Sequence, residues 1–299
     1  MSFIEIKKSC VDSLTTINKF HTNPRVLRLD LVHPVISGNK WFKLKKYLEE
    51  AQLLNKRTIL TFGGAFSNHI LATAAAGFSA GLKTVGIIRG KNQVSLSPTL
   101  EDAKNYGMQL FFISREDYRN KMIPSHVFEY CDRHEIYLIN EGGYGIKGAE
   151  GAKDILKEIN VTEYTHIIAA VGTGTMLAGL TDASTQDQKI IGISVLKNNL
   201  SLQKAIENLV SKENQSRFSL VHDYHFGGYA KYSHSLIDFM NDWYYKTTIP
   251  SDFVYTGKLF YGINDLIQKE YFSPQSKLLI IHSGGIQGNR SLPNGTLIF

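Results

Sequence analysis

The fold is decided by the stretch Thr58-Ile59-Leu60-Thr61-Phe62-Gly63-Gly64-Ala65-Phe66-Ser67-Asn68-His69. An apolar run ends in a glycine pair, and the mostly small residues from Leu71 to Gly77 follow as a predicted helix. Ligands of open α/β sheets bind at such strand-to-helix turns, so Ser67, Asn68 and His69 are candidate site residues. Ser and Asn are also preferred helix caps, and a cap without any ligand explains them equally well.

The alternation of short apolar runs with longer helical segments continues along the chain and predicts an α/β fold. Strands are expected at Thr58 to Phe62, Thr84 to Arg89, Gln109 to Ser114, Ile136 to Ile139, His166 to Val171, Lys189 to Val195 and Lys277 to His282. Helices are expected at Ser67 to Ala80, Pro98 to Tyr106 and Arg115 to Arg133, and from near Met176, Leu200, Ser233 and Gly262. These βα units indicate parallel-rich sheets flanked by helices.

A glycine-dense connector from Glu141 to Gly151 divides the chain into two blocks and suits a bent crossing or a ligand-facing loop. The extended segment from Asn23 to Leu31 is interpreted as an edge strand of the second block. We therefore predict a smaller α/β domain over residues 40–145 and a larger domain built from residues 1–39 and 146–299.

The composition excludes several classes of protein. The chain has 299 residues, 43% of them apolar, and its formal net charge of +6 comes from dispersed Lys and Arg without the block expected of a nucleic-acid arm. Cys10 and Cys131 form no CxxC, and His222 and His225 would point to opposite faces of a strand, so we expect no disulfide framework and no metal. No signal-peptide core and no run near about 18 apolar residues occurs, so we expect a soluble cytoplasmic protein without a membrane or nucleic-acid partner.

One lysine stands out from the others. Lys40 follows Gly38-Asn39, where a loop enters a predicted helix, so its amine can be desolvated and its pKa lowered towards reactivity. Lys43, Lys45 and Lys46 follow closely and are interpreted mainly as solvated residues of a helix face. Lys40 is therefore the candidate reactive amine.

A second glycine turn, Gly172-Thr173-Gly174-Thr175, follows the apolar strand that ends at Val171. A helix beginning there would offer free N–H groups and its positive dipole end to a phosphate. A dinucleotide fingerprint is the competing interpretation, but it requires a small residue where Leu177 stands and an acid after the next strand, where Lys197 stands. The turn is therefore interpreted as an anion site.

Further motifs complete an ordered set: Ser-Gly-Asn-Lys, Gly-Gly-x-x-Ser-Asn-His, Glu-Gly-Gly, Gly-Thr-Gly-Thr, Gly-Gly-Tyr, Tyr-Thr-Gly-Lys and His-Ser-Gly-Gly. From about Arg25 to Gly285 this set resembles the 1-aminocyclopropane-1-carboxylate deaminase and D-cysteine desulfhydrase family. The resemblance implies the tryptophan-synthase-β-like architecture, fold type II, in which two α/β domains enclose pyridoxal 5'-phosphate. It also implies a small amino-acid substrate and a homodimer.

By the same resemblance, Lys40 would hold pyridoxal phosphate as a Schiff base, and the phosphate would rest on the turn from Gly172 to Thr175. Asn68 would bond the ring hydroxyl of the cofactor. Ser67 and His69, together with Asn68, would receive the substrate. Tyr229 and Tyr255 fall at the family's two active-site tyrosines, which position the substrate or relay protons.

Three departures refine the expected reaction. Thr256 stands where the deaminases carry the acid that pairs with the pyridine nitrogen, and Ser283 supplies a hydroxyl where they are apolar. Both favour β-elimination, with D-cysteine giving pyruvate, ammonia and sulfide, over ring opening. Phe66 replaces a common glutamine and reshapes the expected pocket. A true cyclopropane deaminase and a catalytically silent amino-acid-binding protein stay open as alternatives.

Overall fold

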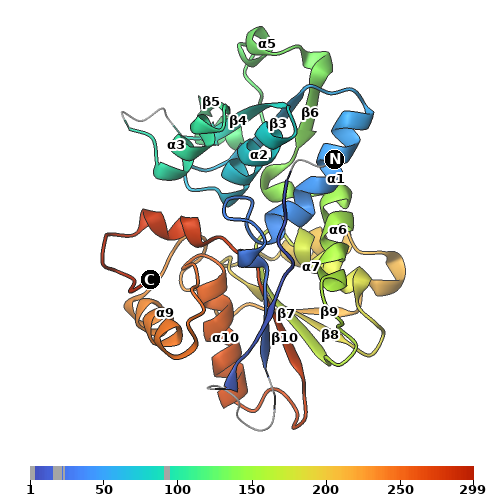
Figure 1. Ribbon diagram of the computed structural model, residues 1–299, viewed down its shortest axis with the longest axis vertical. Coiled ribbons are helices and arrows are strands. Elements are labelled where there is room, and N and C mark those ends of the chain that lie inside the picture. The colour runs from blue at the N-terminus through green and yellow to red at the C-terminus, as the bar shows by residue number, and fades with distance from the viewer. Residues whose placement is uncertain (1–3, 16–21, 23, 91–94) are drawn as a thin grey trace.

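The computed structural model describes residues 4–15, 22, 24–90 and 95–299, and it contains two sheets (Figure 1). The larger sheet has, in spatial order, the strands β1 (Val11–Ser13), β2 (Arg25–Arg28), β10 (Leu278–His282), β7 (His166–Val171), β8 (Lys189–Ser194) and β9 (Phe218–Val221). The smaller sheet has β5 (Gln109–Ile113), β4 (Lys83–Arg89), β3 (Thr58–Gly63) and β6 (Ile136–Ile139). Every described strand pair is parallel except that of β1 with β2. The predicted parallel-rich α/β fold is confirmed.

Helices cover both faces of the larger sheet, with α9 and α10 on one side and α6 and α7 on the other (Figure 1). The helices are α1 (Asn39–Leu53), α2 (Asn68–Ser79), α3 (Pro98–Asn105), α4 (Arg115–Arg119), α5 (Val127–Tyr130), α6 (Ile146–Ala152), α7 (Thr175–Ala183), α8 (Leu202–Glu207), α9 (His234–Thr247) and α10 (Thr256–Gln268). Short 3-10 turns are η2 (Leu29–Leu31), η3 (Arg133–Glu135), η4 (Glu141–Gly143), η5 (Lys153–Lys157), η6 (Lys212–Asn214) and η7 (Ile286–Ser291).

Strand β7 shows why its sequence is apolar throughout. Ile167 and Ala169 pack into the core beneath α6 and α7, whereas Ile168 and Ala170 pack into the core beneath α9 and α10. A strand buried on both faces needs apolar side chains at consecutive positions. The same requirement explains the apolar runs of β3, β4 and β10, all buried along most of their length.

The long helix expected over 115–133 is wrong. The structure has two short helices there, α4 and α5, separated by a loop in which Lys121 adopts a φ of +52°. Pro124 lies in this loop, and proline disfavours helical geometry at the residue before it and cannot donate an N–H. The segment therefore turns back towards the smaller sheet.

Three further details differ from the prediction. β2 is not an edge strand, because β1 pairs with its outer side, and Asn23 lies outside the described residues. Strand β9 was not predicted. Helix α10 begins at Thr256, well before Gly262, because the buried Asp252 accepts hydrogen bonds from the N–H groups at the start of this helix.

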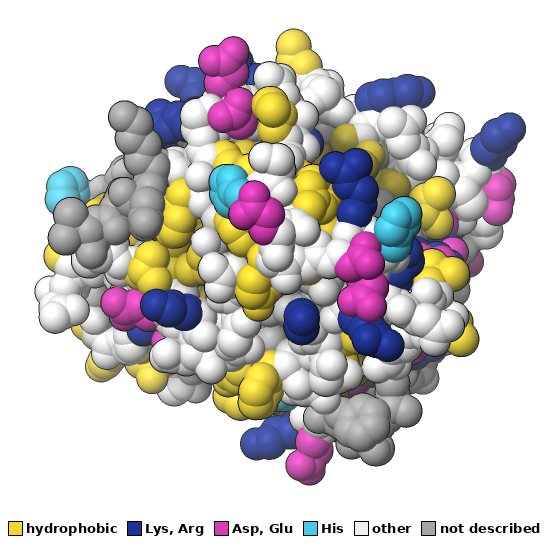
Figure 2. Space-filling view, turned by 90° about the horizontal axis from the view of Figure 1, so that it is seen from above, with side chains coloured by type: hydrophobic (Ala, Val, Ile, Leu, Met, Phe, Trp, Pro, Cys, Tyr) yellow, Lys and Arg dark blue, Asp and Glu magenta, His cyan; other side chains and the backbone are white. Residues whose placement is uncertain are grey.

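The division into domains 1–39 with 146–299 and 40–145 stays a prediction. Among the described residues, no helix has both the length and the apolar character needed to cross a bilayer. On the face drawn in Figure 2, basic side chains are scattered among acidic ones. That distribution agrees with the dispersed charge of the sequence.

Candidate active site

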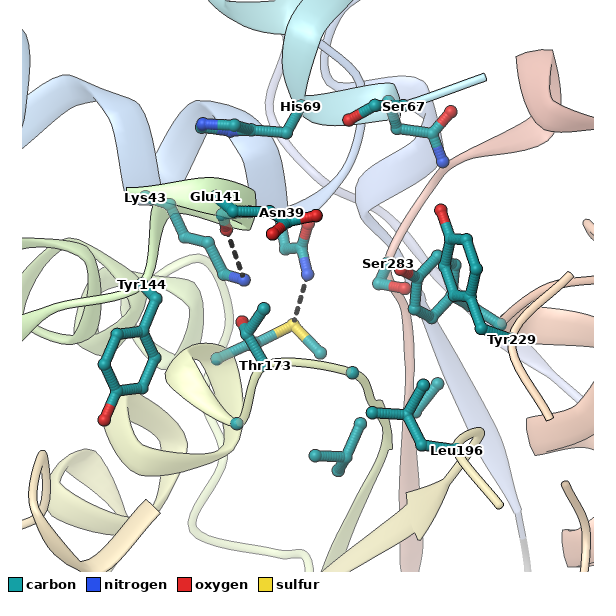
Figure 3. A pocket seen from close by; sticks show the side chains of 18 of the residues that line it. Asn39, Lys43, Ser67, His69, Glu141, Tyr144, Thr173, Leu196, Tyr229 and Ser283 are labelled. Atoms are coloured by element: carbon teal, nitrogen blue, oxygen red, sulfur yellow. Dashed lines mark hydrogen bonds between the residues drawn. The ribbon is translucent and has the colours of Figure 1, made fainter. Parts of the chain in front are cut away.

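A cavity of about 750 Å³ opens between the two sheets, at the carboxyl ends of β3, β4, β7 and β10. On the side of the smaller sheet its walls include Lys40, Ser67, Asn68 and His69. On the side of the larger sheet they include Gly172, Thr173, Gly174, Tyr229, Tyr255 and Ser283 (Figure 3). The structure therefore brings together most of the residues singled out from the sequence. Thr175 and Thr256 are fully buried beside the cavity and do not line it.

Lys40 is placed by a close backbone approach between α1 and the end of β10. The N–H of Asn39 donates to the carbonyl of Ser283 at 3.2 Å, and Gly38, with a φ of +67°, leaves no room for a side chain there. The Lys40 side chain borders the cavity, and its Nζ donates to Asn39 Oδ1 at 2.6 Å. Burial lowers the pKa of Lys40 to about 8, although the negative charge of Asp252 opposes the shift. A neutral, nucleophilic amine is thus accessible near neutral pH.

Lys43 is buried, so the interpretation of Lys43 as a mainly solvated residue is wrong. Its side chain is only 5% exposed and lines the cavity, where Nζ donates to the carbonyl of Gly142 at 3.3 Å (Figure 3). Burial and the charge of Lys40 hold the pKa of Lys43 well below its usual value. The spacing of three from Lys40 was the available signal, since residues three apart share a helix face. Lys45 and Lys46 instead pair with acids outside the cavity.

The start of α2 confirms the capping interpretation of Ser67. Its Oγ accepts the N–H of Ile70 at 3.3 Å, yet Ser67 also borders the cavity, so cap and site residue are compatible. Asn68 is buried, and its Oδ1 has no hydrogen-bond partner among the described residues. Because unsatisfied buried polar atoms are costly, this carbonyl is ready to accept a bond from a ligand.

His69 is neutral, and its tautomer follows from its neighbour. Thr61 Oγ1 gives its one proton to the carbonyl of Ile139, so the 2.9 Å contact with His69 Nε2 requires that the imidazole donate. His69 Nδ1 is then a bare acceptor, buried without a partner among the described residues. Burial, with the charges of Lys40 and Lys43, lowers the pKa of His69 to about 3.

The glycine turn after β7, here called the cradle, has a backbone geometry that suits an anion. Gly174, with a φ of +85°, precedes α7, whose first N–H groups face the turn. A Cβ on Gly172 would lie 3.0 Å from Cε1 of Tyr255, so the ring packs directly on this glycine. A Cβ on Gly142 would lie 2.9 Å from Cγ2 of Thr173. Because Lys43 Nζ donates to the carbonyl of Gly142, the amine of Lys43 also lies next to the cradle.

Tyr229 and Tyr255 meet edge to face, with ring centroids 6.2 Å apart. Burial raises the pKa of both hydroxyls, that of Tyr255 most strongly, so both stay protonated at neutral pH and can donate. The pair lines the same cavity as the cradle and Lys40.

Two buried charged residues that sequence reasoning missed hold these tyrosines. Asp252 Oδ2 accepts the N–H groups of Val254 and Tyr255, each at 3.0 Å. Lys258 Nζ donates to the carbonyl of Gly228 at 2.7 Å, immediately before Tyr229. An acid just before a helix is a capping signal, and it was overlooked because α10 was expected to start later.

The hydroxyl of Thr256 is engaged by Asp252, and Thr256 does not line the cavity. Its Oγ1 donates to Asp252 Oδ1 at 2.8 Å and accepts the N–H of Asp252 at 2.7 Å. Ser283, by contrast, lines the cavity at the end of β10. The predicted role of either residue beside a pyridine nitrogen stays a prediction.

The residues present fit a phosphorylated aldehyde cofactor. An amine of lowered pKa faces a glycine cradle at a helix N-terminus, and the bare Asn68 Oδ1 lies in the same cavity. A group that carries both a carbonyl and a phosphate satisfies all of these features at once.

No family model matches the chain, but individual proteins of known name are similar to it. A Thermotoga maritima protein provisionally named 1-aminocyclopropane-1-carboxylate deaminase is 29% identical, over 95% of this chain and 96% of its own. A bifunctional mitochondrial D-cysteine desulfhydrase and 1-aminocyclopropane-1-carboxylate deaminase of Arabidopsis thaliana is 26% identical, over 88% of this chain and 72% of its own. A D-cysteine desulfhydrase of Klebsiella pneumoniae is 26% identical, over 87% and 86%.

Solved structures agree with the sequence relatives. The crystal structure of a 1-aminocyclopropane-1-carboxylate deaminase homologue superposes with a TM-score of 0.82 at 27% identity, covering 96% of this chain and 94% of the other. A threonine deaminase of Solanum lycopersicum superposes with a TM-score of 0.66 at 14% identity, covering 94% and 80%, and shares the fold. These comparisons confirm the expected resemblance to the 1-aminocyclopropane-1-carboxylate deaminase and D-cysteine desulfhydrase family. They also confirm fold type II and pyridoxal 5'-phosphate as the class of cofactor.

Proposed function

Because this chain is related over most of its length to the 1-aminocyclopropane-1-carboxylate deaminase and D-cysteine desulfhydrase family, we propose that it catalyses pyridoxal-phosphate-dependent β-elimination from a small amino acid. The proposed reaction converts D-cysteine and water to pyruvate, ammonia and hydrogen sulfide. The observation that carries the proposal is Lys40, a reactive amine that faces an anion cradle and two protonated tyrosines around one cavity.

In the proposed site, Lys40 would hold the cofactor through its aldehyde, and the N–H groups from Gly172 to Thr175 would hold its phosphate. The amine of Lys43 lies beside this cradle, where a bound phosphate would favour its protonated form, and this position supports its assignment as a further phosphate ligand. Asn68 would bond the ring of the cofactor, and Ser283 would serve the pyridine nitrogen. When bound, pyridoxal phosphate supplies the electron sink that acidifies the α-carbon of the substrate.

The chain's own residues then supply binding and proton transfer. The amine of Lys40 would take the α-proton of the substrate, which its lowered pKa of about 8 favours. Ser67 and Asn68 receive the substrate carboxylate. His69 has its one proton committed to Thr61, so it offers the site an acceptor and not a donor. Tyr229 and Tyr255 are the proposed donors to the departing sulfur.

The hydroxyl of Thr256 favours elimination over ring opening in this proposal. It is engaged with Asp252 and brings no carboxylate to the cavity, so a protonated pyridine nitrogen would find no acidic partner at this position. The runner-up is 1-aminocyclopropane-1-carboxylate deaminase activity, which one bifunctional relative favours. A silent binding protein is the alternative of another class.

The proposal is tested by loading the purified protein with pyridoxal phosphate, reducing it with borohydride and locating the adduct by mass spectrometry. An adduct on Lys40, with pyruvate and sulfide formed from D-cysteine faster than 2-oxobutanoate from the cyclopropane substrate, supports the proposal. Faster turnover of the cyclopropane substrate reverses the order of the two activities. No adduct and no turnover favour the binding protein. Homodimer assembly and a cytoplasmic location stay predictions of the sequence.

A further inference from the structure

Arg89 is a cation in the cavity wall that the proposed mechanism does not use. It ends β4, next to the glycine turn that follows β3, and one of its guanidinium nitrogens lies 3.5 Å from where a Cβ on Gly64 would stand. Within the described part of the chain, its guanidinium forms no hydrogen bond or ion pair and only faces the ring of Tyr118, 5.6 Å from the centroid. Five N–H donors are therefore free to bind an anion.

The acidic residue that lines this cavity, Glu141, is already engaged. Glu141 pairs with Lys121 at 2.7 Å, and Lys121 Nζ stands over the ring of Tyr118 at 4.4 Å. Burial and then the carboxylate of Glu141 raise the pKa of Tyr118, so its hydroxyl stays protonated beside that acid. Arg89, Lys121 and Glu141 all line the cavity, and together they leave one positive charge in excess.

Within this cluster, Arg89 lies next to the turn that carries the proposed substrate-binding residues and not at the phosphate cradle. Arg89 neighbours Gly64, at the turn that leads to Ser67, whereas Lys43 lies beside Thr173. Burial raises the pKa of Tyr229, and the hydroxyl of Tyr255 and the cation of Arg89 oppose that shift, so the guanidinium lies within electrostatic reach of the proposed proton donor.

We propose that Arg89, with Lys121 beside it, forms a second anion-binding subsite that takes an acidic group carried on the β-carbon of the substrate. Besides D-cysteine, the site would then take α-amino acids with a second anionic group, an extension that rests on the proposed function. A guanidinium recognises the oxygens of a carboxylate, sulfate or phosphate through paired N–H donors. A thiol or a methyl group cannot accept such paired hydrogen bonds.

The elimination remains balanced for such a substrate. The Cα–H bond breaks and its proton passes to Lys40, while the bond from Cβ to the leaving oxygen breaks and the electron pair leaves with the acidic group. The resulting enamine takes up water to give pyruvate and ammonia. Arg89 then stabilises the charge that develops on the leaving group.

The test compares serine O-sulfate, whose β-substituent is anionic before elimination, with β-chloroalanine, whose β-substituent is neutral. Both enantiomers of each are used, and pyruvate formation is the readout. We expect Arg89→Gln to lower the ratio of kcat/KM for the sulfate to that for the chloride by about 10- to 100-fold, the size of a lost charged hydrogen bond. Arg89→Lys should fall between. Lys83→Gln, at the opposite end of the same strand, should leave the ratio unchanged.

An equal loss for both substrates would place Arg89 on the α-carboxylate or in the folding of the chain, and no loss for either would remove the subsite. If the wild type converts neither substrate, the proposed reaction fails, but the subsite is still tested by calorimetric titration with aspartate and alanine. Tighter binding of aspartate that Arg89→Gln abolishes supports the subsite. The same ratio of affinities in both proteins overturns it.

Discussion

Gly38 and Ser283 touch backbone to backbone at the point where α1 meets the end of β10. A Cβ on Gly38 would lie 1.8 Å from the carbonyl oxygen of Ser283, closer than any contact between non-bonded atoms. The contact joins the first turn of α1, which carries Lys40, to the end of the larger sheet, and Lys40 lines the same cavity as the glycine cradle. The position of Lys40 therefore depends on a residue without a side chain.

Gly38→Ala should destabilise the protein and displace Lys40. The substitution adds both the strain of a φ of +67° and an overlap with backbone that cannot rotate away. Gly81→Ala is the matched control, because Gly81 has a φ of +68° but no atom within 4 Å of its Cβ position. We expect a loss of about 1 kcal/mol for the control and a clearly larger loss for Gly38→Ala in urea unfolding, with weaker borohydride-trapped cofactor. Equal losses would show that the overlap relaxes.

Lys40→Ala should abolish turnover, and the reactivity of Lys40 should follow its lowered pKa. Because the neutral amine attacks, the rate at which the cofactor-free protein bonds pyridoxal phosphate should rise with pH and level off above about 8. An ordinary lysine would not level off until near its usual pKa of about 10.4. Lys46→Ala, which removes an amine paired with Glu49, should give the wild-type profile. Wild-type turnover by Lys40→Ala would remove the mechanism.

Lys43→Met should weaken cofactor binding through the phosphate alone. We expect the affinity for pyridoxal phosphate to fall about 10- to 100-fold, the cost of one charged hydrogen bond, while pyridoxal, which has no phosphate, binds nearly as in the wild type. Fluorescence titration of both compounds measures the difference. A loss of the same size for both compounds would place Lys43 elsewhere in the site.

His69 should make the protein sensitive to acid. Its pKa is about 3 in the fold and about 6.5 when unfolded, so the unfolded chain binds the proton more tightly. The contribution of neutral His69 to the free energy of unfolding is fully present above pH 6.5. It falls by up to about 1.4 kcal/mol per pH unit as the pH drops towards 3. Urea midpoints of His69→Gln should decline less over this window than those of the wild type. His134→Gln, at an exposed site, serves as the control.

The sequence predicts the turns of the backbone better than it predicts which charged side chains are buried. The turns after β3 and β7 were predictable because an apolar run followed by glycines is a local pattern. The break between α4 and α5 was missed because helical periodicity outweighed Pro124. The burial of Lys43, Asp252 and Lys258 was missed because a sequence shows that a residue is charged, but only tertiary packing decides whether it is enclosed.

Lys258 should act on the reaction through Tyr229. The Lys258 amine, fully buried, donates to the carbonyls of His225 and Gly228, and it ties the loop that carries Tyr229 to α10. Both carbonyls also accept a backbone N–H, so Lys258→Met should leave the loop folded but less fixed. We expect a fall in kcat of about tenfold, as for a misplaced proton donor, with the affinity for pyridoxal phosphate retained.

A double-mutant cycle with Tyr229→Phe separates this role from a general loss of stability. If Lys258 works by holding the Tyr229 hydroxyl, then once that hydroxyl is gone Lys258→Met should cost little more in kcat, and the two effects should be far from additive. Lys258→Arg, which keeps the charge and the donors, should recover part of the rate. Full additivity of the two substitutions would instead assign Lys258 to the packing of α10, because the rate loss would then be independent of the tyrosine.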